Sequence, residues 1–262
     1  MVMELFRVDG KVALVTGAGR GIGAATARVL AEAGADVAIS SRTEVELEEV
    51  ADAVRSHGRR AFVFPADISE TDQIEAFCAA TCAEFGGIDI VVNNAGGTAP
   101  RPFTATSAGY LERAFHFNVT TAFVMTKAAL PSMLERGGGS VVNISSAIGR
   151  LRDRGFVAYG TAKAAMSHMT RLTAADLAPK VRVNGIAVGS TATSALETVL
   201  TNEALHSEMI ARTPLRRLGS PEDIAMGVLY LASDAAGWIT GKIIDIDGGL
   251  EEANLDLNLP DV

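Results

Sequence analysis

A tyrosine and a lysine four residues apart, Tyr159 and Lys163, are the side chains of this sequence with the clearest capacity for chemistry. Residues at positions i and i+4 of a helix share a face, so a phenol and an ammonium would lie side by side. Free tyrosine titrates near pH ~10 and free lysine near ~10.4, so neither is a useful acid or base at neutral pH by itself. The pair is either a solvated surface pair or a proton donor whose pKa its neighbour adjusts.

A glycine-rich turn, TGAGRGIG at residues 16–23, is the second candidate for chemistry. Gly17, Gly21 and Gly23 follow an apolar run and open an amphipathic segment, close to the spacing of dinucleotide-binding turns. Gly17 permits a tight turn, Gly21 lets the backbone approach a pyrophosphate, and Gly23 lets the helix pack closely on the sheet. The first turn of that helix would present unpaired N–H groups to an anion. The turn therefore predicts a dinucleotide, although such turns also occur for steric reasons alone.

The end of the second apolar run indicates which nicotinamide cofactor binds. A site for NAD carries an acid here to hold the ribose 2′-hydroxyl, but the sequence reads AISSRT, with Ser41 uncharged and Arg42 basic. Arg20, inside the glycine turn, could approach the same place. Because guanidinium groups bind phosphate in a bidentate manner, these residues favour NADP(H) over NAD(H). The alternative is that both arginines are exposed and have no role.

The elements that must position these groups alternate regularly along the chain. Apolar runs rich in Val and Ile predict strands at residues 12–17, 36–40, 61–67, 88–94, 140–146, 181–188 and 242–248. Amphipathic segments predict helices at about 22–34, 43–57, 70–85, 107–136, 156–178 and 221–232. Continuous apolar runs indicate strands buried on both faces. The pattern predicts an α/β fold, a single-domain Rossmann-like doubly wound sheet of about seven parallel strands with helices on both faces.

Two segments depart from this alternation. Residues 188–220 lie at the carboxyl side of the sheet, where such folds bind ligands, and predict a partly helical substrate lid. Its apolar residues are interpreted as packing more often than as substrate wall: Leu196, Val199, Leu200, Leu205, Met209 and Ile210. Residues 251–262 are an acidic C-terminal tail after a catalytic domain at 1–250. The tail is either a frayed terminus or a segment whose Leu255, Leu257 and Leu259 pack on a neighbouring subunit.

Composition excludes several function classes. A formal charge of −8 and a pI near 5.1 argue against a nucleic-acid surface, which needs clustered Lys and Arg. Cys78 and Cys82 lack the further Cys or His ligands of a zinc site, so no metal is expected, and they predict free thiols in a reducing cytosol. The N-terminus has no signal-peptide pattern, and no run of about 18 apolar residues occurs. A cytoplasmic protein with no membrane partner is expected.

Further residues, at fixed distances from these motifs along the sequence, indicate a protein family. NNAG occupies residues 93–96, Ser146 lies 13 residues before Tyr159, and Asn118 lies 28 residues before Ser146. With the glycine turn and Lys163, these motifs resemble the short-chain dehydrogenase/reductases from about residue 8 to 250. The resemblance implies that Tyr159 is the general acid in ketone reduction and the base in alcohol oxidation. It implies that Lys163 holds the nicotinamide ribose and lowers the tyrosine pKa. Ser146 would bind the substrate oxygen, and Asn118 a relay water.

The resemblance also assigns the cofactor contacts. They are Gly17, Arg20, Gly21, Ile22, Gly23, Ser41, Arg42, Asp67, Ile68, Asn94, Ala95, Gly96, Tyr159, Lys163, Gly189, Thr191 and Thr193. Asn93 is expected to be structural. One position departs from the family, because Val188 stands where members usually carry proline. Valine frees φ and restores an N–H, so a looser nicotinamide-side loop is expected, with binding preserved by Gly189 and Thr193.

The sequence leaves the substrate open. Arg150, Arg152 and Arg154 are either a basic rim for an acidic substrate or, as is more usual for charged loop residues, a solvated loop with one internal pair. The chain resembles both the 3-oxoacyl-acyl carrier protein reductases and the bacterial hydroxysteroid dehydrogenases, and fold and motifs do not separate them.

The predicted function is an NADP(H)-dependent oxidoreductase that interconverts a ketone and a secondary alcohol. A non-catalytic NADP-binding sensor or scaffold is the alternative, which the complete set of four catalytic positions disfavours. Wide apolar faces on the helices at 107–136 and 156–178 predict a homo-oligomer, and the resemblance implies a tetramer.

Overall fold

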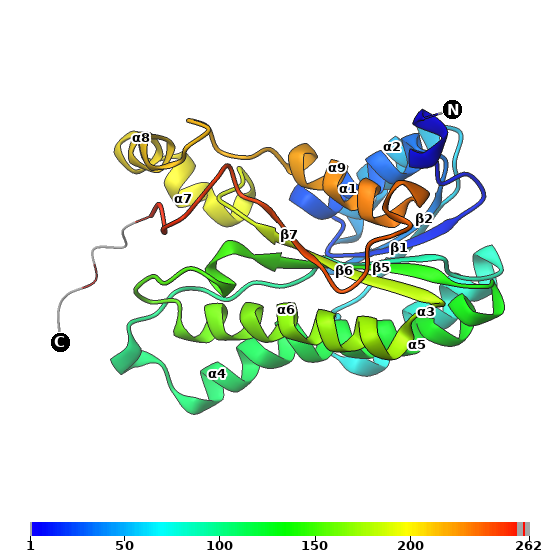
Figure 1. The fold of residues 1–262 in the computed structure, drawn as a ribbon, viewed down its shortest axis with the longest axis horizontal. Coiled ribbons are helices and arrows are strands. Elements are labelled where there is room, and N and C mark those ends of the chain that lie inside the picture. The colour runs from blue at the N-terminus through cyan, green and yellow to red at the C-terminus, as the bar shows by residue number, and fades with distance from the viewer. Residues whose placement is uncertain (1, 256–258, 260–262) are drawn as a thin grey trace.

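The computed structural model describes residues 2–255 and 259, and a seven-stranded parallel sheet forms its centre (Figure 1). The strands stand in the order β3-β2-β1-β4-β5-β6-β7, and every neighbouring pair is parallel. Their bounds are β1 Val12–Thr16, β2 Asp36–Ser41, β3 Ala61–Pro65, β4 Ile90–Asn93, β5 Gly139–Ser146, β6 Val181–Val188 and β7 Ile243–Ile246. Each strand overlaps its predicted range, and the predicted fold class is confirmed.

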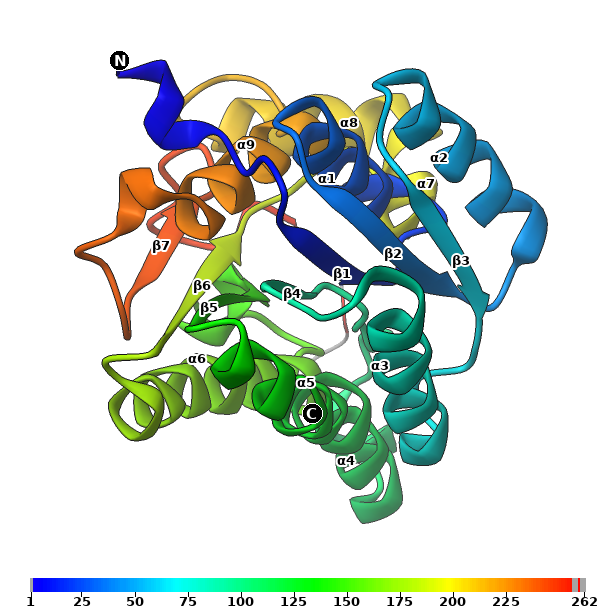
Figure 2. The ribbon, with the colours of Figure 1, turned by 90° about the vertical axis from the view of Figure 1, so that its right-hand side faces the viewer.

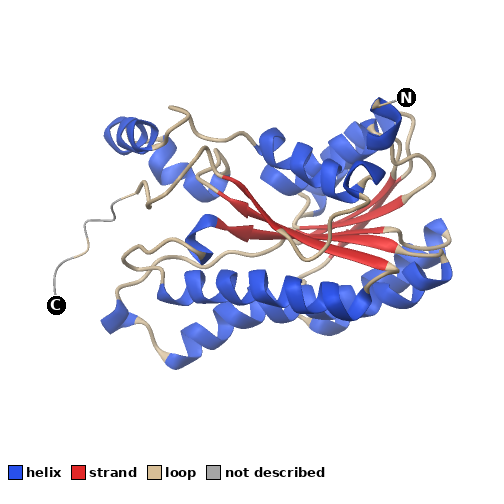
Figure 3. Ribbon diagram, viewed as in Figure 1, coloured by secondary structure: helices blue, strands red, loops and turns tan. Residues whose placement is uncertain are grey.

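Two layers of helices enclose the sheet (Figure 3), and Figure 2 shows them on its opposite faces. One layer holds α1 (Gly21–Glu32), α2 (Glu44–Ser56) and α9 (Pro221–Ala232). The other holds α3 (Thr71–Phe85), α4 (Ala108–Phe115), α5 (Thr121–Glu135) and α6 (Val157–Leu177). Two short helices, α7 (Glu197–Leu200) and α8 (Glu203–Arg212), lie in the segment predicted to be partly helical. No helix within the described part of the chain is long and apolar enough to cross a membrane.

The long helix predicted at 107–136 is divided. His116–Thr120, between α4 and α5, is wound as a π-helix, with wider turns than an α-helix. The completely buried Asn118 lies in the middle of this turn, and its side-chain amide donates to the carbonyl of Ala114 at 2.8 Å. The prediction treated residues 107–136 as one helix, so the interruption was not anticipated. Such turns occur frequently at functional sites.

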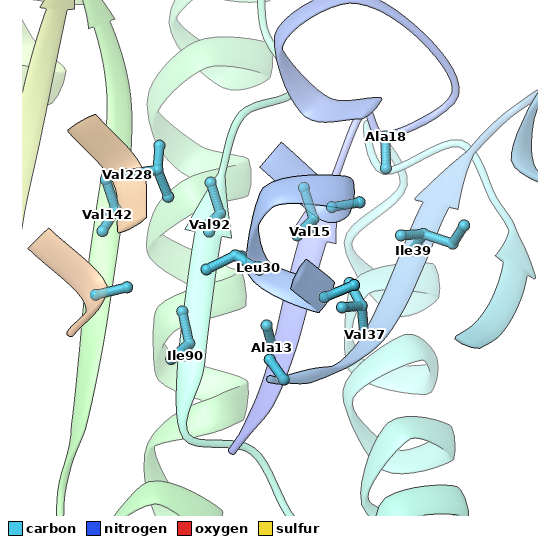
Figure 4. Packing of buried hydrophobic residues seen from close by; sticks show 14 of the residues in the cluster. Ala13, Val15, Ala18, Leu30, Val37, Ile39, Ile90, Val92, Val142 and Val228 are labelled. Carbon is cyan, nitrogen blue, oxygen red and sulfur yellow. The ribbon is translucent and has the colours of Figure 1, made fainter. Parts of the chain in front are cut away.

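Apolar side chains cover the sheet on both faces. On one side Leu30 of α1 packs near Ala13 of β1 and Val92 of β4 (Figure 4). On the other, Leu14 of β1 belongs to a cluster with Phe77 of α3. All five residues of β1 are buried, as the continuous apolar run predicted. Full burial of one large aliphatic or aromatic side chain contributes about 1.5–3 kcal/mol, so the central strands are the best-supported part of the fold.

Helix ends follow the signals in the sequence. α9 begins with a capping box, in which Ser220 Oγ accepts from the Asp223 N–H and the Asp223 carboxylate accepts from the Ser220 N–H. Arg217 donates to the same carboxylate at 2.9 Å and holds its pKa well below the usual range. α3 ends at Gly86, whose φ is +82°.

The strand order reverses between β1 and β4. β2 and β3 extend the sheet on one side of β1, whereas β4 to β7 extend it on the other. Loops that leave the carboxyl ends of β1 and β4 therefore turn to opposite faces of the sheet. A crevice at such a reversal is the usual ligand site of doubly wound folds.

Candidate active site

A cavity of about 1250 Å³ opens at this crevice and extends past the carboxyl ends of β5 and β6. Small-molecule sites usually measure roughly 300–1,000 Å³, so there is room for a cofactor and a substrate together. We call the part lined by the turn at 17–22 and by residues 40–46 and 66–69 the nucleotide end. The part lined by the loop at 147–156, the α7–α8 segment and residues 250–255 is the substrate end.

The glycine turn has the backbone that its sequence predicts. Gly17 and Gly21 have φ of +63° and +55°, in the left-handed region that side chains disfavour. A Cβ on Gly23 would lie 2.3 Å from the carbonyl oxygen of Gly17, so only glycine lets α1 begin against the turn. A Cβ on Gly21 would lie 3.2 Å from Cγ2 of Thr193. The first turn of α1 therefore faces the loop that follows β6 across the cavity.

Asn94 fixes the NNAG turn to the glycine turn. Its side-chain amide donates to the carbonyls of Thr16 and Gly17 at 2.9 and 3.1 Å, and its backbone N–H donates to Thr16 Oγ1 at 3.1 Å. Asn93 points into the core, where its amide donates to Asn143 Oδ1 at 2.8 Å. The interpretation of Asn93 as structural agrees with this contact. Asn94 therefore holds the NNAG turn in a fixed position against the glycine turn.

The nucleotide end carries groups that fit a dinucleotide. Arg20 is the N-cap of α1 and makes no side-chain capping bond, so N–H groups of the first turn are available to an anion. Ser41 Oγ is buried and has no hydrogen-bond partner among the described residues, and Arg42 lines the cavity beside it. The N–H and Oγ of Ser69 donate to Asp67 Oδ1 at 3.0 and 2.8 Å and lower the pKa of this carboxyl. These groups suit phosphate and ribose.

Tyr159 and Lys163 lie on one face of α6, as their spacing predicts, and both line the cavity. Lys163 Nζ is 5.7 Å from the centre of the Tyr159 ring and donates to the carbonyl of Ile144 at 2.8 Å. The phenol of Tyr159 shares a hydrogen bond with Ser146, at the carboxyl end of β5. Strand β5 and helix α6 therefore bring three of the four predicted catalytic side chains together.

Asn118 approaches Ser146, Tyr159 and Lys163 from the π-helical turn. A Cβ on Gly96 would lie 2.8 Å from Asn118 Oδ1 and 3.0 Å from Lys163 Nζ, so these two side chains flank Gly96. Asn118 Oδ1 also accepts from the N–H of Gly97 at 2.8 Å. The fourth predicted side chain thus lies on the lysine side of the group.

Burial moves the pKa values of Tyr159 and Lys163 in opposite directions. Lys163 is 3% exposed, and removal from water lowers its pKa to about 8. Burial raises the pKa of Tyr159, and the hydrogen bond with Ser146 opposes this rise. The protein therefore keeps a neutral phenol, the form that can give a proton. The effect of Lys163 on the tyrosine pKa stays a prediction.

Apolar side chains dominate the substrate end. They are Leu151, Phe156, Leu196, Val199, Leu205, Met209, Leu250 and Leu255. Val199 and Met209 are both buried and cavity-lining, because the α7–α8 segment folds over the opening. Packing, the more usual role of such a stripe, agrees with the burial of Val199 and Met209, and Leu196, Val199, Leu205 and Met209 line the cavity as well.

Arg150 does not form a basic rim. Its guanidinium donates to Asp245 at 3.2 Å, to Asp247 at 2.5 Å and to the carbonyl of Leu250 at 2.7 Å. Asp245 lies within β7 and Asp247 just after it, and their two carboxylates balance the charge of Arg150. This arginine is therefore neither part of a free basic rim nor simply solvated. The charged residue of the 147–156 loop that lines the cavity is Asp153.

The looser loop expected after Val188 stays a prediction, but Val188 itself is held in the sheet. Strand β6 runs through Val188, which pairs with Ser146 on one side and Ile246 on the other. The next N–H, that of Gly189, donates to the carbonyl of Ile246 at 3.0 Å. Valine is compatible with a sheet ladder in a way that proline is not, so the strand continues to the edge of the cavity.

The segment after β7 is fastened over the cavity by Asn254, which is 4% exposed. Its Oδ1 accepts from Ser190 Oγ at 2.7 Å, and its amide donates to Thr213 Oγ1 at 2.9 Å. The adjacent Leu255 lines the cavity. As far as residue 255, the tail is a wall of its own chain's site rather than a frayed end. Leu257 lies outside the described residues.

Glu46 and Asn254 are among the cavity-lining residues that sequence reasoning missed. Glu46 lines the nucleotide end, with its Oε1 3.8 Å from Arg20 Nη1. It is the last residue of TEVE at 43–46, a pattern typical of a helix capping box. Asn254 had no signal beyond being a polar residue close to leucines.

Comparisons with known proteins agree with this arrangement. A family model described as enoyl-(acyl carrier protein) reductase matches residues 17–251. An uncharacterized oxidoreductase of Mycobacterium tuberculosis is 54% identical over 263 residues, covering 100% of both chains. The 7alpha-hydroxysteroid dehydrogenase of Escherichia coli is 40% identical over 250 residues, 95% of this chain and 97% of the relative.

Solved structures show the same fold with cofactors bound. A 7alpha-hydroxysteroid dehydrogenase complexed with NADH and 7-oxo glycochenodeoxycholic acid superposes with a TM-score of 0.92 at 37% identity, covering 98% of this chain and 99% of that one. A gluconate 5-dehydrogenase from Burkholderia cenocepacia in complex with NADP and tartrate gives a TM-score of 0.89 at 33% identity, with 95% and 98% covered. The chain is therefore an oxidoreductase of the short-chain dehydrogenase/reductase family.

Proposed function

We propose that this protein is an NADP(H)-dependent enzyme that interconverts a ketone and a secondary alcohol, with Tyr159 as the general acid and base. The hydrogen-bonded pair of Ser146 and Tyr159 on the cavity wall, between the nucleotide end and the apolar substrate end, carries the proposal. A carbonyl oxygen at this point would meet two hydroxyl groups. Polarisation and protonation of that oxygen are what ketone reduction requires.

The residues of the cavity fit the proposed cofactor from one end to the other. We assign the pyrophosphate to the first turn of α1, the 2′-phosphate to Arg20, Ser41 and Arg42, and the nicotinamide ribose to Lys163. The remaining contacts are assigned to Ile22, Asp67, Ile68, Asn94, Ala95, Gly96, Gly189, Thr191 and Thr193, of which all line the cavity. When bound, the cofactor supplies or accepts the hydride.

The protein's own part is the handling of one proton. In reduction Tyr159 gives its phenolic proton to the substrate oxygen as the carbonyl carbon gains a hydride, so the product is the neutral alcohol. In oxidation the phenolate takes that proton back. A lysine ammonium beside the phenol favours the phenolate, which offsets the effect of burial. Asn118, beside Lys163, would position a water that returns protons from solvent. General acid–base catalysis of this type contributes about 10²–10⁴-fold in rate.

The substrate end favours a neutral, apolar carbonyl compound with a bulky ring skeleton. Its walls are mainly leucine, valine, methionine and phenylalanine, and the nearby Arg150 is already neutralised by Asp245 and Asp247. A hydroxysteroid-like substrate matches these walls, because its apolar surface would be buried without leaving an unpaired charge away from water. A 3-oxoacyl thioester is the second candidate, supported by the family model whose description names an acyl carrier protein.

A substrate panel tests the proposal directly. NADPH consumption is measured with a polycyclic ketone, a simple cyclohexanone, a 3-oxoacyl thioester and a keto sugar acid, and NADP reduction is measured with the corresponding alcohols. The polycyclic ketone should give the highest kcat/KM. If the thioester is the better substrate, the second candidate replaces the first. Binding of NADPH without turnover of any compound would favour a sensor or scaffold.

We also propose a homotetramer in the cytoplasm. Large apolar side chains on the outer helices are exposed, among them Phe115 at 43%, Phe123 at 51% and Leu172 at 57%. A second copy of the chain would cover such side chains and gain the free energy of their burial. Cys78 and Cys82 are free thiols, which fits a reducing compartment. Light scattering at micromolar concentration tests the assembly, and a monomeric mass would contradict it.

A further inference from the structure

A carboxylate lies among the groups assigned to the 2′-phosphate. Glu46 Oε1 is 3.8 Å from Arg20 Nη1. The position that a Cβ on Gly19 would take is 2.9 Å from Glu46 Oε2 and 2.7 Å from Ser41 Oγ, so both oxygens converge on the glycine turn. All four residues line the nucleotide end of the cavity. This carboxylate stands in place of the acid that is missing from the end of β2.

The position of Glu46 is not explained by helix capping. The sequence Thr43-x-x-Glu46 predicts a capping box for α2, but the Thr43 side chain makes no capping hydrogen bond. In the capping box of α9, by contrast, Ser220 and Asp223 make both reciprocal bonds. Glu46 instead faces the glycine turn and Arg20.

Resting on the proposed NADP(H) site, we infer that Glu46 is a cofactor-specificity residue that limits the preference for NADP(H). A 2′-phosphate at this end would meet Arg20 and Arg42, but it would also meet a like charge, and it must replace Glu46 as the partner of Arg20. A ribose 2′-hydroxyl would instead find an acceptor, as it does in sites with an acid after the second strand. The Glu46 carboxylate thus weakens the binding of NADP(H) and supports the binding of NAD(H).

The test is equilibrium binding, so it does not depend on turnover. Calorimetric titrations of NADPH and NADH, and of adenosine 2′,5′-bisphosphate and 5′-AMP as fragments, are made on the wild type and on Glu46→Gln. The variant should bind NADPH and the bisphosphate about 5- to 10-fold more tightly, the scale of a partly exposed charge contact, while NADH and 5′-AMP bind equally or more weakly. Glu49→Gln, which removes the same charge from the same helix outside the cavity, should change neither ratio.

Two further measurements make the outcomes decisive. In the background of Arg20→Gln the gain from Glu46→Gln should shrink, because part of the competition is for that guanidinium. Thermal unfolding checks that both glutamine variants are folded. A Glu46→Gln variant that changes both cofactors equally, or neither, would overturn the inference while leaving the proposed function intact. Wild-type protein that binds neither nucleotide would overturn the proposed function and the inference with it.

Discussion

The two ends of the cavity are built in different ways. The nucleotide end is made from short turns that directly follow β1, β2 and β3, and the side-chain amide of Asn94, just after β4, fixes the first of them by donating to the carbonyls of Thr16 and Gly17. The substrate end is assembled from segments that are distant in the sequence: the 147–156 loop, the α7–α8 segment and residues 250–255. The first end depends on local backbone rules, whereas the second depends on side chains meeting across the fold.

The proposed catalytic corner, formed by Asn118, Ser146, Tyr159 and Lys163, lies between these ends and shares features of both. Ser146 lies at the end of strand β5 and Tyr159 in helix α6. They face the apolar chamber, whose shape depends on the lid and on Asn254. Changes at the corner should therefore affect the rate, changes at the substrate end should affect substrate affinity, and changes at the nucleotide end should affect cofactor affinity.

The largest expected effect is at the corner. Tyr159→Phe removes the proton donor but keeps the ring, so kcat should fall about 10³-fold, within the range of general acid–base catalysis. The dissociation constant for NADPH, measured by titration, should change less than about twofold, because the phenol is not the main holder of the nucleotide. Tyr230→Phe, a tyrosine that packs on Phe6 away from the cavity, is the control. Retained turnover in Tyr159→Phe would refute the assigned role.

The burial of Lys163 should reduce folding stability, as expected for a residue placed for the proposed function rather than for folding. Its pKa falls from 10.5 to about 8 on burial, which corresponds to about 3 kcal/mol of destabilisation at neutral pH. This cost is complete below pH ~8, where both states are protonated, and disappears as the pH rises towards ~10.5. Lys163→Met should therefore be inactive yet more stable than wild type at pH 7, by somewhat less than 3 kcal/mol because the bond to Ile144 is lost.

Denaturant titrations of both proteins across this pH range measure the difference. The gap between Lys163→Met and wild type should close between about pH 8 and 10.5, since the unfolded wild type binds a proton there that the folded protein does not. A gap that is independent of pH would mean that the ammonium is not desolvated as described. Lys180→Met, which changes an exposed lysine, is the matched control.

Asn254 tests the substrate end. Asn254→Ala removes the bonds to Ser190 and Thr213, and the part-buried Ser190 hydroxyl loses its acceptor, whereas Thr213 keeps its bond to the Met209 carbonyl, so stability should fall by about 1 kcal/mol. Leu255 would lose its fixed position, and KM for a bulky ketone should rise about 10-fold while the affinity for NADPH stays within twofold. Asn254→Asp keeps the acceptor for Ser190, so its stability and its KM should lie between those of the wild type and of Asn254→Ala. An equal loss of cofactor affinity would show that the two ends are not separable.

The same contrast explains what the sequence could predict. The glycine turn is a local pattern, and the spacing of Asn118, Ser146, Tyr159 and Lys163 matches that of the family, so both could be recognised in the sequence. The π-helical turn around Asn118 was missed because residues 107–136 were predicted as one continuous helix. Asn254 and the ion pairs of Arg150 join residues about 40 to 100 positions apart, and only the folded chain brings such partners together.

The smallest expected effect concerns the charge of the substrate-end loop. Arg152 is exposed and does not line the cavity, so Arg152→Ala should change kcat/KM by less than about twofold for both a neutral ketone and a keto acid. Asp153→Asn, at the neighbouring position that does line the cavity, should improve the keto acid relative to the neutral ketone because it removes a like charge. A selective loss of keto acid turnover in Arg152→Ala would support the interpretation of these arginines as a basic rim. It would contradict the proposed preference for apolar substrates.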